Sequence, residues 1–346
     1  MFRRVFNLGL RNQARFFNTP GTRVTYKRFD GKTSSSFTEL LFDKTSRKYL
    51  AIVFGTGGLF YLTHLEEAPV TGRTRFIWFP RSLELKVGEY TYNSVIEQTR
   101  GKILPESHPL TRKVSRIFHR IVEAAANDPA VDKTLLKDVN WKIHIVNDPS
   151  MPPNAFVLPG GKVFVFSNIL PICKNEDGLA TVLSHEFSHQ LARHTGENLS
   201  KAPVYAVLGA LLYTITGSEG INRILVDSFM RMPASREMET EADYIGLMVM
   251  SRACFHPEEA VKVWQRMAAV EEKQRRGGLV DLEFLSTHPA TKKRIDNMNK
   301  WLPKSQELYD QSNCGTFGGF YGAFQDAFGH PSTNGISEPK ITIWGI

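Results

Sequence analysis

The stretch His185-Glu186-Phe187-Ser188-His189 says most about the fold and the chemistry of this chain. On a helix, residues four positions apart share one face, so both imidazoles point the same way. Two neutral imidazoles at that spacing can bind one zinc ion. Glu186 lies next to the first histidine, where a carboxylate can take a proton from zinc-bound water. The stretch therefore predicts a hydrolytic zinc site on a helix.

The residues around this motif predict an amphipathic helix from Glu176 to His194. Its apolar residues recur at close to a helical period, at Leu179, Val182, Leu183, Phe187 and Leu191. One face is therefore expected in the core, and the edge with the histidines is expected to open to a cleft. The alternative is a surface helix with two unrelated histidines.

A third zinc ligand is not found next to the motif. Catalytic zinc usually has three protein ligands and one open position. The extended pattern H-E-x-x-H-x-x-G-x-x-H fails, because Ala192 and Thr195 occupy the positions of its glycine and third histidine, and His194 comes one residue early. The ligand must therefore come from another part of the chain.

The segment 235–251 has the pattern of a second helix and offers carboxylates. Glu239 and Asp243 are four residues apart and share a face, whereas Glu241 points roughly to the opposite side. Glu239 can ligate zinc, and Asp243 can orient a ligating histidine through a hydrogen bond. The alternative is a solvated acidic helix face.

The net charge of +8 at pH 7 is concentrated at the N-terminus of this 346-residue chain. Residues 1–30 contain seven basic residues and one acidic residue, so they carry +6 of that charge. The basic character is therefore local, and it does not argue for nucleic acid as a partner. An arginine-rich, acid-poor, amphipathic start predicts a mitochondrial transit peptide and a disordered N-terminus over residues 1–40. The alternative is a basic tail that is not a signal.

Residues 49–65 form an apolar run that predicts one transmembrane helix. At about 1.5 Å per residue the run spans roughly 25 Å, slightly less than a ~30 Å hydrocarbon core. By the positive-inside tendency, its flanking charges place the N-terminal side in the matrix and the rest of the chain in the intermembrane space. Those charges are Lys44, Arg47 and Lys48 before the run and Glu66 and Glu67 after it. A buried core helix is the alternative.

Turn-forming residues and the periodicity of the apolar residues divide the rest of the chain into segments. Residues 66–104 are expected to be a tether whose basic and aromatic residues pack on the domain as a strand or loop, in preference to lying on a membrane surface. A domain over 105–302 and a C-terminal tail over 303–346 follow, and residues 312–335 of that tail are expected to be loosely ordered. Strands are predicted at 141–146 and in a hairpin of 156–158 and 163–166. Helices are predicted at 111–127, 204–216 (buried or membrane-facing), 219–231, 235–253, 256–272 and 289–301.

Four motifs in order resemble one zinc metallopeptidase family, that of HtpX and the CAAX-prenyl endopeptidases. The first two are the H-E-x-x-H stretch and the E-x-x-A-D run from Glu239 to Asp243. Residues 154–166 resemble the family's edge strand beside the catalytic helix, and Ser286-Thr287-His288-Pro289 with Arg294 resembles its closing S-T-H-P segment. The resemblance covers roughly residues 105–302 and is strongest to the mitochondrial inner-membrane members of the family.

The resemblance implies an α+β fold: a mainly helical zincin-like metallopeptidase domain with a small antiparallel sheet, preceded by the transmembrane helix. One zinc ion per chain would be held by His185, His189 and Glu239, with Asp243 behind a histidine and Glu186 as the base. A substrate strand would add to the edge near Asn154, Ala155 and Phe156. His288 would approach the oxyanion or gate the cleft; a capping or packed histidine before Pro289 is the alternative.

The function implied is that of a zinc-dependent endopeptidase of the mitochondrial inner membrane that cleaves misfolded or stress-regulated membrane proteins. Its partners would be protein substrates and membrane lipid, and a homo-oligomer is left open. A non-catalytic zinc-binding scaffold or chaperone-like protein is the alternative, disfavoured because Glu186 is present. An intramembrane protease is disfavoured by the charged residues that flank the motif, which are Glu176, Asp177, Arg193 and Glu197.

The three cysteines have no zinc-ligand spacing. Because the intermembrane space permits disulfides, Cys254 and Cys314 are candidates for a bridge, which would close a loop of about sixty residues and contribute roughly 4 kcal/mol on the chain-entropy model. Cys173 is expected to be a buried free thiol.

Overall fold

The chain divides into two units, Met1–Leu59 and Phe60–Ile346. The structure is a computed structural model that describes residues 44–68, 70–137, 139–218, 220, 232–275, 288–289, 291–312 and 314. Helix α2 (Lys44–Thr63) crosses the boundary between the units, and the large apolar side chains along it are exposed. Among the described helices, none combines the length and the apolarity needed to cross a bilayer. The predicted transit peptide lies outside the described residues.

Residues 66–104, expected as a tether, contain regular structure. Strands β1 (Leu65–Glu67) and β2 (Thr74–Phe76) pair as an antiparallel hairpin, and helix α3 (Arg81–Gln98) follows. Arg75 and Phe76 are buried, so the prediction that this basic and aromatic stretch packs on the domain is confirmed.

The sheet of the second unit has three strands and is mixed. Strands β3 (Lys142–Val146), β4 (Ala155–Leu158) and β5 (Lys162–Phe166) lie in the order β3-β5-β4. The predicted antiparallel hairpin of β4 and β5 is confirmed, but β3 pairs with β5 in parallel, so the prediction of a purely antiparallel sheet is wrong. The loop after β3 crosses to the far edge before β4 begins, which leaves the inner strand β5 as the partner of β3. Strand periodicity cannot reveal such a crossing.

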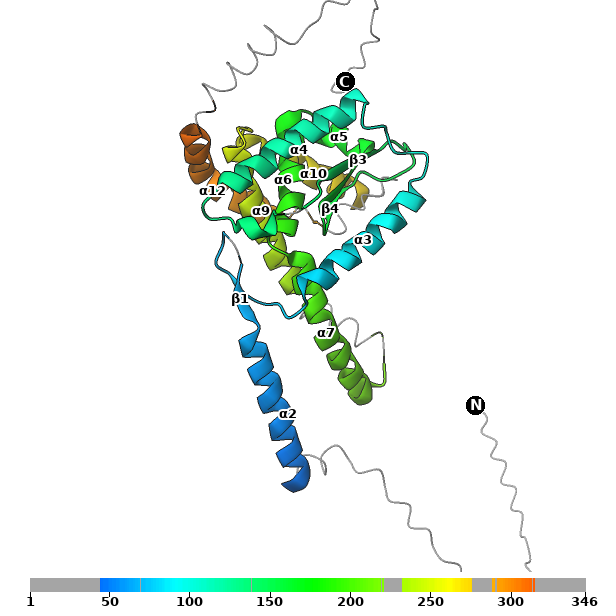
Figure 1. The fold of residues 1–346 in the computed structure, drawn as a ribbon, viewed down its shortest axis with the longest axis vertical. Coiled ribbons are helices and arrows are strands. Elements are labelled where there is room, and N and C mark those ends of the chain that lie inside the picture. The colour runs from blue at the N-terminus through cyan, green and yellow to red at the C-terminus, as the bar shows by residue number, and fades with distance from the viewer. Residues whose placement is uncertain are drawn as a thin grey trace, which may run out of the picture. The chain divides into compact units, whose positions relative to one another are not determined.

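The central strand β5 is buried on both faces. Its valines pack in the main core with helices α4 (Pro109–Asn127) and α6 (Glu176–Leu191), while Phe164 and Phe166 pack with apolar residues of α3 on the other face. Helix α4 contributes an apolar stripe, namely Val114, Ile117, Phe118, Ile121 and Ala125. The sheet is therefore held between α3 and the two helices of the core, which fixes its edge beside α6 (Figure 1).

Helices α6 and α9 (Met232–Arg252) approach each other closely. A Cβ atom added to Gly246 of α9 would lie 3.1 Å from the backbone nitrogen of His185, so glycine permits the contact. Helix α6 begins at Asn175, whose side chain accepts a hydrogen bond from the Gly178 amide, and acidic residues in its first turn suit the helix dipole. The remaining elements are η1 (Lys133–Leu135), η2 (Ser167–Ile169), α5 (Leu170–Cys173), α7 (His194–Thr216), α10 (Glu258–Arg275) and α12 (Lys292–Gln311).

Helices α7 and α12 differ from their predicted forms. The first turns of α7 are buried, but its second half extends away from the unit with exposed Val204, Val207 and Leu211 (Figure 1). Of the two alternatives predicted for residues 204–216, a buried or a membrane-facing helix, these exposed side chains exclude the buried one. Helix α12 continues through Pro303 to Gln311, ten residues beyond the helix predicted at 289–301, and Tyr309 stacks on His256 there. The helix predicted at 219–231 lies almost wholly outside the described residues.

Candidate metal centre and active site

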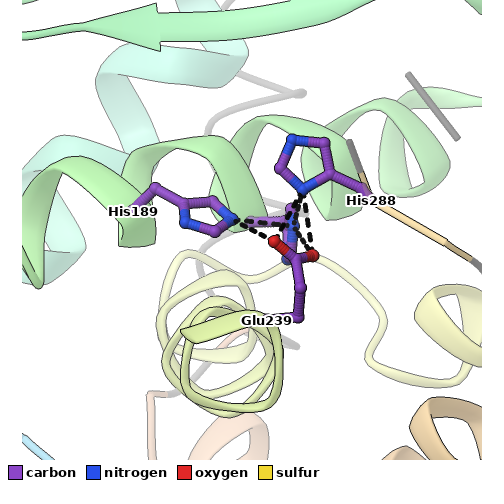
Figure 2. Close-up of side chains that lie close together, drawn as sticks. His189, Glu239 and His288 are labelled. Atoms are coloured by element: carbon purple, nitrogen blue, oxygen red, sulfur yellow. Dashed lines mark hydrogen bonds and ion pairs between the residues drawn. The ribbon is translucent and has the colours of Figure 1, made fainter. Parts of the chain in front are cut away.

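Four potential ligands from three parts of the chain meet beside helix α6. They are His185 and His189 of α6, Glu239 of α9, and His288 from the segment before α12, and one ligand atom of each lies within 4.8 Å of the others. Figure 2 shows His189 and His288 pointing toward the carboxylate of Glu239. The structure thus brings together the three residues predicted as zinc ligands and adds a fourth.

The distances between the ligand atoms suit zinc. The two Nε2 atoms of His185 and His189 are 3.1 Å apart, and they lie 3.3 Å and 3.4 Å from oxygens of Glu239. A tetrahedral zinc ion with bonds of about 2.0–2.1 Å keeps its ligand atoms roughly 3.3–3.4 Å apart. One ion therefore fits between these three side chains.

The hydrogen bonds behind the histidines also favour a cation. Nδ1 of His189 lies 2.7 Å from Nδ1 of His194, and Nδ1 of His185 lies 3.1 Å from Oδ1 of Asp243, although at a poor angle for a hydrogen bond. If each Nδ1 carries the proton, the two Nε2 atoms face each other with lone pairs. Lone pairs at that distance repel unless a cation lies between them.

Asp243 and Arg294 form a buried ion pair behind His185. The guanidinium of Arg294 contacts both oxygens of Asp243 at 2.7 Å and an oxygen of Glu239 at 3.1 Å. Its plane lies over the ring of Trp264, with 3.7 Å from Cζ to the ring centre. Burial acts to raise the pKa of Asp243, but Arg294 and His185 together outweigh burial and the pKa is lowered. Asp243 is therefore an anion that lies 3.1 Å from Nδ1 of His185, and its predicted role in orienting that ring stays a prediction.

His288 occupies the fourth position around the candidate metal. Its Nδ1 atom lies 2.9 Å from both oxygens of Glu239 and 3.3 Å from Nε2 of His185. A catalytic zinc site normally keeps this position open, so the arrangement is closed. Ser286 and Thr287 of the S-T-H-P segment lie outside the described residues.

Glu186 is buried beside the four ligands. Its Oε1 atom lies 3.6 Å from Nε2 of His288 and has no hydrogen-bond partner within the described part of the chain. Burial raises the pKa of Glu186, while the charges of His288 and His185 act in the opposite direction. A carboxylate with a raised pKa and an unused oxygen is suited to accept a proton.

His194 and Glu241 belong to the site but were missed from the sequence. Glu241 does point away from the ligands, yet its Oε2 atom lies 3.0 Å from Nε2 of His194, which contacts His189. The bend that brings His194 back is at Arg193, where φ is 52°. Among residues other than glycine such a value is uncommon, and no pattern in the sequence marks it. The only local signal was a histidine five residues after His189.

Strand β4 carries the predicted substrate-binding residues. Asn154 and Ala155 are buried, and Phe156 is partly exposed. On one side β4 pairs with β5; its other edge has no strand partner among the residues the structure describes. Helix α6, which carries His185 and His189, packs against β4.

The sulfurs of Cys254 and Cys314 are bonded at 2.07 Å, which joins the end of α9 to the residues after α12. Cys173 is a buried free thiol, and burial raises its pKa to about 12.

Comparison with known proteins gives one family and several relatives. The profile described as Peptidase family M48 matches residues 111–302. The chain is 60% identical over 322 residues to the protein named mitochondrial metalloendopeptidase OMA1 of Saccharomyces cerevisiae, with 92% of each chain covered. Identity to the protein of the same name from Schizosaccharomyces pombe is 40% over 293 residues, covering 84% of this chain and 80% of the relative. Identity to a human relative, metalloendopeptidase OMA1, mitochondrial, is 27% over 267 residues, covering 74% of this chain and 49% of the relative.

Proposed function

This chain belongs to peptidase family M48 and is a metalloendopeptidase, and we propose that it is a zinc-dependent endopeptidase of the mitochondrial inner membrane. The observation that carries the zinc assignment is the approach of His185, His189 and Glu239: the two Nε2 atoms are 3.1 Å apart, and each lies 3.3–3.4 Å from one of the two oxygens of Glu239. Zinc in such a site polarises a substrate carbonyl and lowers the pKa of water.

The residues of the chain supply the proton transfers. Glu186 accepts a proton from the attacking water and passes it to the amine that leaves when the peptide bond breaks. Its burial beside the ligands excludes bulk water, and Arg294 holds Glu239 and Asp243 in place from behind.

His288 has to withdraw before a peptide can bind. In the closed arrangement its ring fills the position that water and the substrate carbonyl need, so it acts as a gate. Its Nδ1 atom contacts Glu239 and His185, two of the other potential ligands, which supports a gate at the metal centre.

The substrate backbone adds to the outer edge of strand β4. An extended peptide on that edge would form main-chain hydrogen bonds with residues 154–158 and pass beside α6. Strand addition recognises the backbone of the substrate more than its side chains, which suits an enzyme that cleaves many different misfolded proteins.

Membrane attachment is proposed through helix α2. Its apolar residues from Tyr49 onward are exposed, and basic residues precede them while acidic residues follow. That asymmetry supports a metal centre in the intermembrane space, and the arginine-rich residues 1–30 support import into mitochondria. Sodium carbonate should fail to extract the protein, and added protease should digest the domain once the outer membrane is ruptured. Protection in such mitoplasts would place the domain in the matrix.

The natural substrates are proposed to be misfolded or stress-regulated proteins of the inner membrane, as expected for an enzyme anchored beside them. The relatives named as mitochondrial metalloendopeptidases support a mitochondrial peptidase, and no observation favours the alternative of a non-catalytic scaffold.

Metal analysis and cleavage of an unfolded protein test the proposal together. The purified full chain in detergent should contain one zinc per chain, lose cleavage when a chelator removes the metal, and regain it when zinc is restored. Bound zinc without cleavage under any condition would instead support the scaffold. Loss of membrane-protein fragments from mitochondria lacking the protein would identify substrates.

A further inference from the structure

A buried chain of contacts runs outward from the ligand His189. Nδ1 of His189 lies 2.7 Å from Nδ1 of His194, and Nε2 of His194 lies 3.0 Å from Oε2 of Glu241. His194 and Glu241 are only 3% and 5% exposed, so water does not compete for these contacts. The polar groups of His189, His194 and Glu241 therefore form hydrogen bonds with one another and not with water.

One assignment of protons satisfies this chain when both rings are neutral. Nε2 of His189 faces the other ligands and must keep its lone pair, so the proton is on Nδ1, which donates to Nδ1 of His194. The proton of His194 is then on Nε2, which donates to the carboxylate of Glu241. A carboxylate behind a zinc-binding histidine fixes its tautomer and its ring plane, and here it does so through a second ring.

Glu241 is in turn held by the hairpin that follows α2. The hydroxyl of Thr71 donates to Glu241, and Nε of Arg73 donates to it at 2.8 Å. Arg73 also pairs at 2.7 Å with Glu197, a fully buried acid of α7. Because it lies between two buried carboxylates, Arg73 compensates charges that would otherwise be costly to bury.

The same hairpin and helix α3 hold the bend that places His194. Arg75 donates to the carbonyl of Ala192 at the end of α6, and Nε of Arg193 donates to the buried carboxylate of Glu84 at 3.1 Å. The left-handed backbone at Arg193 is therefore stabilised from two sides. Without it, His194 would continue along α6 and point elsewhere.

We propose that His194 and Glu241 are positioning residues of the metal centre, which hold the ring of His189 in its metal-binding orientation and connect it through Arg73 to the β1–β2 hairpin. The inference rests on the zinc endopeptidase function proposed above. Loosening the hairpin frees the ring of His189 to rotate and weakens one ligand without touching the other two.

A purely structural role for these residues makes a different prediction. Glu241 would serve only to balance the charge of Arg73, and His194 only to begin α7. Substitutions would then lower the thermal stability of the metal-free protein and leave its affinity for zinc unchanged.

The test measures the zinc dissociation constant of the full chain in detergent, by competition with a chromophoric chelator, and the visible spectrum of the cobalt-substituted protein. His194→Ala removes the acceptor for His189 and should weaken zinc binding by about 10–100-fold and shift the cobalt spectrum. His194→Asn places an amide oxygen near the lost Nδ1 atom and should recover part of the affinity. Glu241→Gln should act in the same direction by a smaller factor, and Arg73→Gln by a smaller factor still.

Two matched controls carry the same kinds of substitution elsewhere. The first control is His119→Ala, at an exposed residue of α4, and the second is Glu237→Gln, at an exposed residue of α9 one turn before Glu241. Both variants should keep the zinc affinity and the cobalt spectrum of the wild type. If the wild-type chain binds no zinc, the proposed function fails first. If it binds zinc, and His194→Asn and Glu241→Gln both show the wild-type dissociation constant and spectrum, the positioning role is overturned, even where His194→Ala does not fold.

Discussion

The two histidines proposed as zinc ligands, His185 and His189, are supported in different ways. Behind His185 stands a carboxylate, Asp243, which Arg294 grips through two contacts of 2.7 Å. Behind His189 stands a second imidazole, His194, and the carboxylate of Glu241 comes one step later. One ligand therefore has a direct anionic support and the other has a relayed one.

The two supports also come from opposite ends of the domain. Arg294 belongs to α12, the last described helix, whereas Arg73 belongs to the hairpin that follows α2. The metal centre is thus held by contacts that form only when both ends of the domain have folded onto α6 and α9. Because a metal site of this kind is complete only in the folded state, metal affinity and folding stability are coupled.

The largest effect on cleavage is expected from substitution of Glu186, which contributes to neither the Asp243 support nor the His194–Glu241 support. Glu186→Gln removes the proton acceptor but leaves both histidines, Glu239 and their supports unchanged. The rate of cleavage should fall by about 10²–10⁴-fold, while the zinc content and the melting temperature stay near those of the wild type. Glu176→Gln, exposed in the first turn of the same helix, is the control and should cleave normally. Cleavage retained in Glu186→Gln would require a different base.

A second, smaller effect distinguishes the direct support from the relayed one. Asp243→Asn removes the charge next to His185 and leaves Arg294 with Glu239 as its remaining carboxylate partner. Zinc affinity should fall by about 10–100-fold, and by more than in Glu241→Gln, whose charge acts through a second ring. Chelator competition on both variants measures the difference. Equal losses would mean that distance from the ligand does not decide the strength of a support.

The contact of Asp243 with His185 was predictable from the sequence, whereas the contacts of His194 and Glu241 behind His189 were not. Glu239 and Asp243 are four residues apart on one helix, as are His185 and His189, and helical spacing is a local property. Contact between His194 and Glu241 instead depends on a left-handed residue at Arg193 that is held by a salt bridge from α3. A tertiary contact of this kind overrides the local preference and leaves no periodic signal.

The same distinction applies to the fold. Helices α4, α6, α9 and α10 and the β4–β5 hairpin follow from periodicity and turn residues, and the structure contains them. The parallel pairing of β3 with β5 was missed, because it is decided by where the connecting loop crosses and not by the residues of either strand. The helix predicted at 289–301 extends in the structure through Pro303 to Gln311, with Met298 and Ser305 buried on either side of the proline.

His288 tests whether the closed arrangement is a gate, and the expected effect on cleavage is modest. His288→Ala empties the fourth ligand position without touching either support, so cleavage should equal or exceed that of the wild type by a few-fold, while zinc binds more weakly. Steady-state kinetics with a quenched fluorescent peptide would measure kcat and KM. A loss of about 10²–10³ in kcat with KM unchanged would show instead that His288 stabilises the oxyanion.

The smallest effect on metal binding is expected from the disulfide between Cys254 and Cys314. The bond closes a loop with a sequence separation of 60, for which the chain-entropy model gives a stabilisation of about 4 kcal/mol. Reduction should therefore lower the melting temperature clearly. Zinc affinity should change little, because Arg294 keeps its own contacts with Asp243 and Glu239. The double variant Cys254→Ser/Cys314→Ser is the control and should no longer respond to reductant.

The disulfide also allows the two supports to be distinguished by experiment, because it constrains the helix that carries Arg294 but not the hairpin that carries Arg73. It ties the residues after α12 to the end of α9, and α12 carries Arg294, whereas Arg73 lies at the other end of the domain. Combining Cys314→Ser with Asp243→Asn should therefore give a loss of zinc affinity that differs from the sum of the single losses, because once Arg294 has lost its contacts with Asp243 its position beside Glu239 depends more on the disulfide. Combining Cys314→Ser with His194→Asn should give an additive loss. Equal coupling in both pairs would mean that the two histidines share one support, and the distinction between a direct and a relayed support would fail.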